Sequence, residues 1–249
     1  MKLMPLTEPG DAIACAARAI IEMVQRKPDA ILGLATGGTM EPLYALLVAA
    51  HRDGLSFARI RTVNLDEYVG LPPDHPNSYH RYMARHFLEH VDVPPANSFI
   101  PCGHIDPARA ASQYASLLDD LGPVDLQLLG IGENGHIGFN EPGTALDAPT
   151  RVTALSPITM AANARFFSPG AEVPSQAVTM GTAAILSARR IVVLATGRAK
   201  SAALADALDG PVCPECPASY LRLHPDCTIH ADHAAGALLR VLPSQRPAA

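Results

Sequence analysis

A glycine-rich segment at 129–143, LGIGENGHIGFNEPG, brings one imidazole and one carboxylate close together in the chain. His136 and Glu141 lie five positions apart, and the glycines around them permit tight turns, so the two side chains can meet across a turn. Histidine titrates near neutrality, and a hydrogen-bonded carboxylate fixes its tautomer and raises its basicity. A lone loop histidine is more often structural, but this density of glycine favours a pair that moves protons on the oxygen atoms of a substrate.

The same segment contains a literal G-x-G-x-x-G at Gly130, Gly132 and Gly135. A dinucleotide-binding fold needs an amphipathic helix directly after this motif and an acidic residue at the end of a second strand about twenty residues later. Pro142 and Gly143 interrupt such a helix, and no such strand follows. We therefore reject a nicotinamide cofactor.

A second acidic feature, Asp66-Glu67, follows the apolar run at 60–65. Alternate side chains of a strand point to opposite faces, so both carboxylates cannot face one pocket. A carboxylate at the end of a strand, partly desolvated by bound substrate, has its pKa raised and can remove a carbon-bound proton. One of the two is a candidate base, and a solvated acidic turn is the alternative.

An anion site is indicated by the segment 34–39, which leaves an apolar run and enters a helix. Gly37 and Gly38 let the backbone approach a ligand, Thr36 and Thr39 offer hydroxyls, and the helix start supplies free N–H groups. The alternative is an ordinary strand-to-helix turn. No Lys-Ser or Lys-Thr follows the glycines, so a Walker loop is excluded and the expected guest is a monophosphate.

Two basic side chains further along the chain can neutralise a phosphate. Arg165 and Lys200 each stand beside the predicted end of a strand or start of a helix. Taken singly, a charge of this kind is more often a solvated surface charge than a phosphate ligand.

These residues need a scaffold, and apolar runs alternating with helical spacing predict a parallel α/β sheet. The predicted strands lie at 30–34, 60–65, 124–129, 191–195 and 227–230. The predicted helices lie at 10–26, 40–52, 77–90, 107–121, 180–188 and 198–208. Turn residues concentrate at 70–77, 139–150 and 209–219. In such sheets ligands bind at the carboxyl ends of the strands, where the three chemical segments fall.

Composition bounds the remaining possibilities. With 249 residues, 48% of them hydrophobic, the chain suits one globular domain over 1–249. A net charge of -5 and no basic run beyond an Arg pair argue against nucleic acid as a partner. No apolar stretch approaches the length of a membrane span, and no leader segment is evident, so a cytoplasmic location is expected.

The five cysteines do not form the even, tightly spaced framework of a small secreted domain, and reduced thiols are expected. Cys213 and Cys216, with His224 and Cys227 nearby, have donor types that suit zinc. Short motifs of this kind often match by chance, and prolines beside both cysteines indicate a plain loop. We expect no metal.

Taken together and in order, these segments resemble the glucosamine-6-phosphate deaminase family, which shares its fold group with 6-phosphogluconolactonase and ribose-5-phosphate isomerase. The likeness spans nearly the whole chain. It is carried by LGLATGGT at 32–39, NLDEYVGLPPDHPNSY at 64–79, LLGIGENGHIGFNEPG at 128–143, ANARFF at 162–167 and LRLHP at 221–225.

The resemblance implies a Rossmann-like three-layer α/β/α fold with a mostly parallel sheet, and deamination of glucosamine 6-phosphate without cofactor or metal. By this likeness Asp66 is the base that moves a proton from C2 to C1, and His136, oriented by Glu141, assists ring opening. The residues that would hold the phosphate are Thr36, Gly37, Gly38, Thr39, Arg165 and Lys200.

Two departures from the family pattern bear on regulation and pH. At the position of Asn134 the family often has Asp, and Asn134 completes the candidate catalytic set here. An amide cannot supply the negative charge that favours the imidazolium form of His136. Allosteric members use basic residues after the His–Glu loop, whereas here Arg151 is kept and Thr153 replaces an expected Lys. We expect altered pH behaviour, no such activation, and a monomer or small homo-oligomer.

Three alternatives stay open. The substrate can be galactosamine 6-phosphate, because the sequence does not reveal the stereochemistry at C4. The chain can be a 6-phosphogluconolactonase, although NLDEYVG and HIGFNEPG favour deamination. It can also be a non-catalytic sugar-phosphate sensor. Two observations argue against a sensor: the chain has Asp66, His136 and Glu141, and no helix-turn-helix segment precedes the domain.

Overall fold

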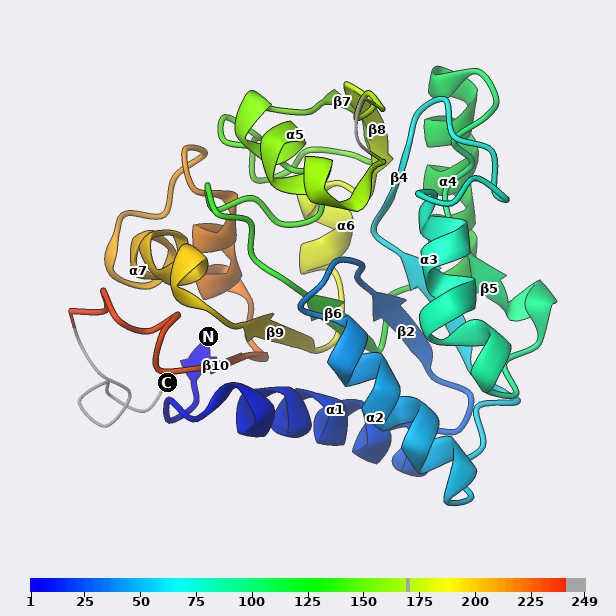
Figure 1. Ribbon diagram of the computed structural model, residues 1–249, viewed down its shortest axis with the longest axis horizontal. Coiled ribbons are helices and arrows are strands. Elements are labelled where there is room, and N and C mark those ends of the chain that lie inside the picture. The colour runs from blue at the N-terminus through cyan, green and yellow to red at the C-terminus, as the bar shows by residue number, and fades with distance from the viewer. Residues whose placement is uncertain (169–170, 241–249) are drawn as a thin grey trace.

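A central parallel sheet organises the chain in the computed structural model, which describes residues 1–168 and 171–240 (Figure 1). The strand order is β1-β10-β9-β6-β2-β3-β5, and every neighbouring pair is parallel. In that order the strands are Lys2–Leu3, Cys227–Ala231, Ile191–Ala195, Leu126–Leu129, Ile31–Leu34, Arg61–Asn64 and Ser98–Phe99. Residues of β2, β6 and β9 are all buried, as expected of strands covered on both faces.

Helices cover both faces of this sheet. Helices α1 and α2 lie together below it in Figure 1, and α6 and α7 lie above it. The α-helices, from α1 to α7, are Pro9–Arg26, Glu41–Arg52, Tyr79–His86, Pro107–Leu121, Pro157–Asn163, Thr182–Leu186 and Ser201–Asp209. Short 3-10 helices are Leu88–His90, Pro95–Asn97, Ala164–Phe166, Arg198–Lys200 and Pro217–Leu223. The predicted three-layer α/β/α architecture is confirmed.

A second, antiparallel sheet of three strands was not foreseen from the sequence. Its order is β4-β8-β7, with β4 at Asp66–Tyr68, β8 at Gln176–Thr179 and β7 at Arg151–Ala154. The strands are short, and β7 is half-exposed and lacks the apolar alternation that marks a strand in a sequence. This sheet matters because β4 carries Asp66.

Local capping explains which helix boundaries were predicted well. Helix α4 spans 107–121 as expected, because Asp106 caps Arg109 N at 2.9 Å, Pro107 starts the helix and Gly122 leaves it at φ 79°. The helix predicted at 77–90 instead breaks at Phe87, whose φ of -143° is not helical. The one predicted at 180–188 is reduced to Thr182–Leu186 because Gly181 is extended.

The apolar core fills the space between the parallel sheet and its helices. Leu32, Leu126 and Val192 on neighbouring strands are all 0% exposed, and α1 contributes Ile20 on its buried face. Each such side chain contributes roughly 1.5–3 kcal/mol by leaving water. Within the described ranges, no helix has both the length and the apolar character to cross a membrane.

Candidate active site

A cleft of about 250 Å³ opens where the carboxyl ends of the strands meet the second sheet. Its lining comes from residues within 35–41, 76–86, 130–139 and 159–167, and from Leu65, Asp66, Tyr68 and Lys200. The predicted site residues that line it are Thr36, Gly37, Gly38, Thr39, Asp66, His136, Arg165 and Lys200. The structure therefore brings together the predicted base, imidazole and phosphate ligands, which are up to 164 residues apart in the chain (200 − 36).

The candidate base, Asp66, is 6% exposed and lies on β4 paired with Thr179. Burial raises the pKa of its carboxyl well above the ordinary value, and the charge of Glu67 raises it further. Gly138 permits the close approach of the neighbouring loop, since a Cβ there would lie 3.4 Å from Asp66 Oδ2 and the backbone has φ 56°. Glu67 is 0% exposed and lies outside the cleft, so the alternation prediction is confirmed and a solvated acidic turn is excluded.

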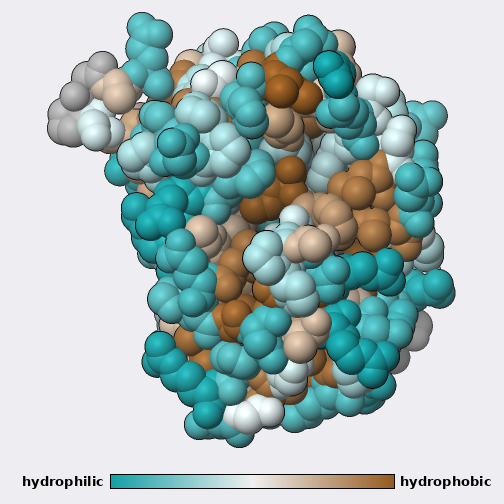
Figure 2. All heavy atoms as spheres, turned by 90° about the vertical axis from the view of Figure 1, so that its right-hand side faces the viewer, coloured by the Kyte–Doolittle hydropathy of each residue, from teal (hydrophilic) through white to brown (hydrophobic). Residues whose placement is uncertain are grey.

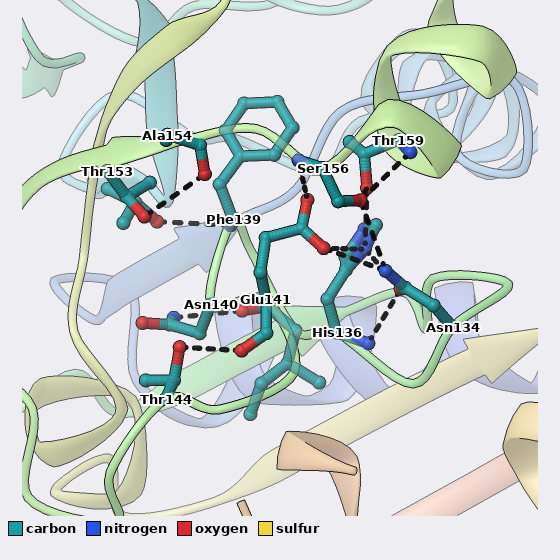
Figure 3. A network of polar contacts seen from close by, with 12 residues as sticks. Asn134, His136, Phe139, Asn140, Glu141, Thr144, Thr153, Ala154, Ser156 and Thr159 are labelled. Atoms are coloured by element: carbon teal, nitrogen blue, oxygen red, sulfur yellow. Dashed lines mark hydrogen bonds and ion pairs between the residues drawn. The ribbon is translucent and has the colours of Figure 1, made fainter. Parts of the chain in front are cut away.

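His136 and Glu141 do meet across the glycine-rich loop, with Asn134 between them (Figure 3). The Asn134 amide donates from Nδ2 to Glu141 Oε2 at 2.7 Å, and its Oδ1 lies 2.7 Å from His136 Nδ1. The direct distance from His136 Nδ1 to Glu141 Oε2 is longer, 3.7 Å. Asn134 thus makes the near contact with the ring, and Glu141 acts on His136 through that amide.

This chain of contacts fixes the protonation pattern of the imidazole. A carboxylate only accepts, so Asn134 must turn its NH₂ to Glu141 and its carbonyl to the ring, which requires a proton on His136 Nδ1. Burial lowers the pKa of His136 well below its usual value, although Glu141 opposes this. The neutral ring therefore keeps Nε2 free as an acceptor.

Glu141 is held as a carboxylate by its neighbours. Burial acts to raise its pKa, but hydrogen bonds from Thr159, the charge of His136 and the amide of Asn134 together lower it. Its other oxygen accepts the Ser156 backbone N–H at 3.2 Å. The loop is also tight, because a Cβ on Gly132 would lie 2.3 Å from His136 Nδ1.

The anion loop lies at the start of α2, opposite the acid–base groups. Gly37 has φ 106°, a region that favours glycine, and its carbonyl accepts Met40 N–H and the Tyr82 hydroxyl, both at 2.9 Å. A Cβ on Gly38 would lie 4.0 Å from Arg165 Nη2, so that guanidinium borders the loop. The geometry is that of a helix N-terminus with cationic support.

The two cations differ in exposure. Arg165 is exposed and lies over the Phe166 ring, with its Cζ 4.8 Å from the ring centroid. Lys200 is half-buried, and burial lowers the pKa of its amine; Glu133 acts to raise it and Arg165 to lower it. Both side chains face one cleft, which favours phosphate binding over the alternative of isolated surface charges.

An aromatic wall beside Asp66 was missed by the sequence analysis. Tyr68 lies 5.0 Å from Tyr79 and 5.7 Å from Phe167 between ring centroids, and Tyr79 stacks on Phe139 at 6.1 Å. The sequence offered a signal, since Tyr68 and Tyr79 bound the proline-rich segment next to the base. Glu133 and Thr159, which also line the cleft, had no separate signal.

The cysteine segment does not assemble a metal site in the part of the chain that the structure describes, where no group of three or more His, Cys, Asp or Glu side chains could hold an ion. His224 Nε2 instead bonds to the Ala188 carbonyl at 2.7 Å. Ser219 Oγ accepts from Cys213 N and donates to Cys213 O, as in an ordinary loop. Cys213, Cys216 and Cys227 are free thiols, as expected.

Comparisons with known proteins agree with this geometry. The family described as glucosamine-6-phosphate isomerases/6-phosphogluconolactonase matches residues 10–229. A glucosamine-6-phosphate deaminase of Geobacillus sp. (strain WCH70) is 49% identical over 248 residues, 99% of this chain and 98% of that protein. Glucosamine-6-phosphate deaminase 1 of Bacillus subtilis (strain 168) is 47% identical over 240 residues, 96% of this chain and 99% of that protein.

Solved structures give the same result. A monomeric glucosamine-6-phosphate deaminase superposes with a TM-score of 0.92 at 46% identity, covering 96% of this chain and 100% of that one. A 6-phosphogluconolactonase from Trypanosoma brucei has a TM-score of 0.74 at 23% identity, covers 95% of this chain and 97% of that one, and shows a common fold alone. The chain belongs to the glucosamine-6-phosphate isomerase/6-phosphogluconolactonase family.

Proposed function

We propose that this protein is a glucosamine-6-phosphate deaminase, which converts glucosamine 6-phosphate and water into fructose 6-phosphate and ammonia. The observation that carries the proposal is one cleft in which a buried carboxylate, Asp66, and a neutral imidazole, His136, lie opposite an anion loop. Relatives at 47–49% identity over nearly the whole chain bear this name.

The residues take the following roles in the proposed reaction. The phosphate binds at 36–39 with Lys200 and Arg165, which fixes the sugar in the cleft. His136, through its free Nε2, accepts the anomeric hydroxyl proton and delivers a proton to the ring oxygen, so that the ring opens to an aldehyde. Asp66 then removes the C2 proton and returns it to C1 while a proton passes from the amine to the C1 oxygen, which turns the aldose amine into a C2 imine.

Hydrolysis of the imine completes the reaction. Water adds its oxygen to C2, the C–N bond breaks, and the nitrogen leaves as ammonia while a ketone forms. The isomerisation needs a positioned base, a proton relay on oxygen and an anchor for the phosphate. Each acid–base group contributes about 10²–10⁴-fold to the rate. We propose that the enzyme works in the cytoplasm, where phosphorylated sugars are retained.

A monomer without allosteric activation is the proposed state. The similar solved deaminase is monomeric. Arg151, which would have to reach an effector, donates instead to Asn140 Oδ1 at 2.8 Å and to Thr144 Oγ1 at 3.1 Å. Thr153 carries no charge to add to it.

The proposal is tested by ammonia release from glucosamine 6-phosphate, with galactosamine 6-phosphate and 6-phosphogluconolactone assayed in parallel. We expect release from the first and at least tenfold lower kcat/KM with the second. Faster reaction with galactosamine 6-phosphate would identify this C4 epimer as the preferred substrate. Lactone hydrolysis without ammonia would assign the lactonase activity, and saturable binding without turnover would assign a sensor.

A further inference from the structure

Glu67 is a buried carboxylate beside the candidate base, and the roles proposed above leave it unused. It is 0% exposed, and its position on β4 directs it away from the cleft that Asp66 lines. Its Oε1 accepts the Tyr68 backbone N–H at 2.8 Å and that of Tyr79 at 3.0 Å. Its Oε2 accepts the backbone N–H of Tyr79 at 2.8 Å and of His80 at 3.1 Å, and lies 3.0 Å from His80 Nδ1.

These contacts place Glu67 at the N-terminus of α3. Tyr79 and His80 are the first two residues of that helix, and the third, Arg81, is capped by Ser78 Oγ at 3.0 Å. Glu67 therefore satisfies the N–H groups that a helix start leaves open and places a negative charge at the positive end of the helix dipole. The strand that carries the base and helix α3 are joined through one side chain.

Helix α3 in turn reaches the phosphate loop. Tyr82, one turn along the helix from Tyr79, donates its hydroxyl to the Gly37 carbonyl at 2.9 Å. Both tyrosines line the cleft. A continuous path of hydrogen bonds thus runs from β4 through Glu67 and α3 to Gly37, so a displacement of α3 changes the distance between the base and the phosphate anchor.

The charge of Glu67 also acts directly on Asp66. After burial, it is the next cause that raises the pKa of the Asp66 carboxyl. The other titratable groups that face Asp66 are the phenols of Tyr68, Tyr79 and Tyr114, whose own pKa values burial raises, so they are neutral at physiological pH. His80 faces Glu67 on the side away from the cleft.

We propose that Glu67 is a positioning residue for the deaminase reaction: it fixes α3 and the phosphate loop relative to the strand that carries Asp66, and it places a buried carboxylate next to that base in the strand. This inference rests on the proposed function. It predicts two separable effects, because alignment with the phosphate governs KM and the charge governs the pH dependence of catalysis.

The test measures kcat/KM for glucosamine 6-phosphate against pH in the wild type and in Glu67→Gln, a variant of nearly the same size without the charge. We expect the acid limb of the profile to move to lower pH by about one unit, since a neighbouring like charge shifts a carboxyl pKa by about that much. We expect KM to rise at least fivefold. The matched control is Glu89→Gln, which removes the exposed partner of Arg81 at 2.7 Å and leaves both readings unchanged.

Two further variants keep the test decisive if Glu67→Gln folds poorly, as circular dichroism would reveal. Glu67→Asp keeps the charge but shortens the side chain, so KM rises while the acid limb stays in place. Tyr82→Phe removes only the hydroxyl on Gly37, so KM rises severalfold with the acid limb unchanged.

The outcomes separate this inference from the proposed function. If the wild type is active, either of two results contradicts the role of Glu67 and leaves the deaminase proposal standing. The first is an acid limb that does not shift in Glu67→Gln. The second is a KM that is unchanged in both Glu67→Asp and Tyr82→Phe. A wild type that releases no ammonia contradicts the proposed function itself.

Discussion

The two walls of the cleft are built differently. On the acid–base wall, Asp66 is buried and His136 is half-buried, and glycines stand where a side chain would collide. Behind this wall, short contacts through Asn134 connect His136 to Glu141. On the phosphate wall the ligands are a loop backbone, an exposed Arg165 and a half-buried Lys200. On the side of the molecule that carries α3 and α4, hydrophobic residues lie among hydrophilic ones (Figure 2).

This difference between the walls matches their two tasks, proton transfer and phosphate binding. Groups that move protons need fixed geometry and perturbed pKa values, and a buried, hydrogen-bonded wall supplies both. A phosphate group is already charged and needs only complementary donors, which solvent-exposed side chains can provide when substrate arrives. Variants on the first wall should therefore change kcat, and variants on the second should change KM.

The largest expected effect comes from removing the base. Asp66→Asn keeps the shape of the side chain but cannot accept the C2 proton, so kcat should fall by about 10²–10⁴-fold. KM should change by less than a few fold because the phosphate wall is untouched. Steady-state ammonia release gives both constants, and circular dichroism confirms the fold. A variant that keeps a tenth or more of the wild-type kcat would show that another group is the base.

His136→Gln should have the next largest effect. The amide can occupy the same space but cannot exchange a proton with the sugar oxygens, and we expect kcat to fall by about 10²-fold, the lower end for one acid–base group. The substrate opens slowly by itself, so part of the rate should survive. Raising the temperature increases the share of substrate in the open-chain form, so the difference in kcat between His136→Gln and the wild type should become smaller. An equal loss of kcat at all temperatures would argue for a structural role.

On the phosphate wall, Lys200→Met should raise KM by about tenfold, since a hydrogen bond to a charged group contributes about 1.5–3 kcal/mol. Arg165→Met should raise KM less, because its guanidinium is exposed and screened by solvent. In both variants kcat should stay within a factor of about three. Ammonia release across a range of substrate concentrations gives kcat and KM separately. A loss of kcat with unchanged KM would contradict the assignment of substrate binding to this wall.

The smallest effect concerns pH. Asn134→Asp places a negative charge at Nδ1 of His136, which raises the pKa of the imidazole from its lowered value. The pH at which the imidazole titrates, followed by NMR of the histidine rings, should therefore move up by about one unit. The acid limb of kcat/KM should change little, because Asp66, whose pKa is raised well above the ordinary carboxyl value, sets that limb. An imidazole titration that does not move would contradict the contact between position 134 and the ring of His136.

Much of this arrangement could be predicted from the sequence, because buried parallel strands are apolar throughout and helix caps leave clear signals, as at α4. The glycine-rich loop also indicated that His136 and Glu141 meet. The contact by Asn134 was not foreseen, since spacing alone does not show which side chain lies between two others. The second sheet was missed because its strands are short and Asp66 lies on a polar one.

The central claim is that this cleft deaminates glucosamine 6-phosphate, and the most direct measurement follows both products in one reaction of the wild-type protein. Ammonia and fructose 6-phosphate should accumulate in equal amounts from the first time point. Formation of neither product, or of a sugar phosphate without ammonia, would contradict the account.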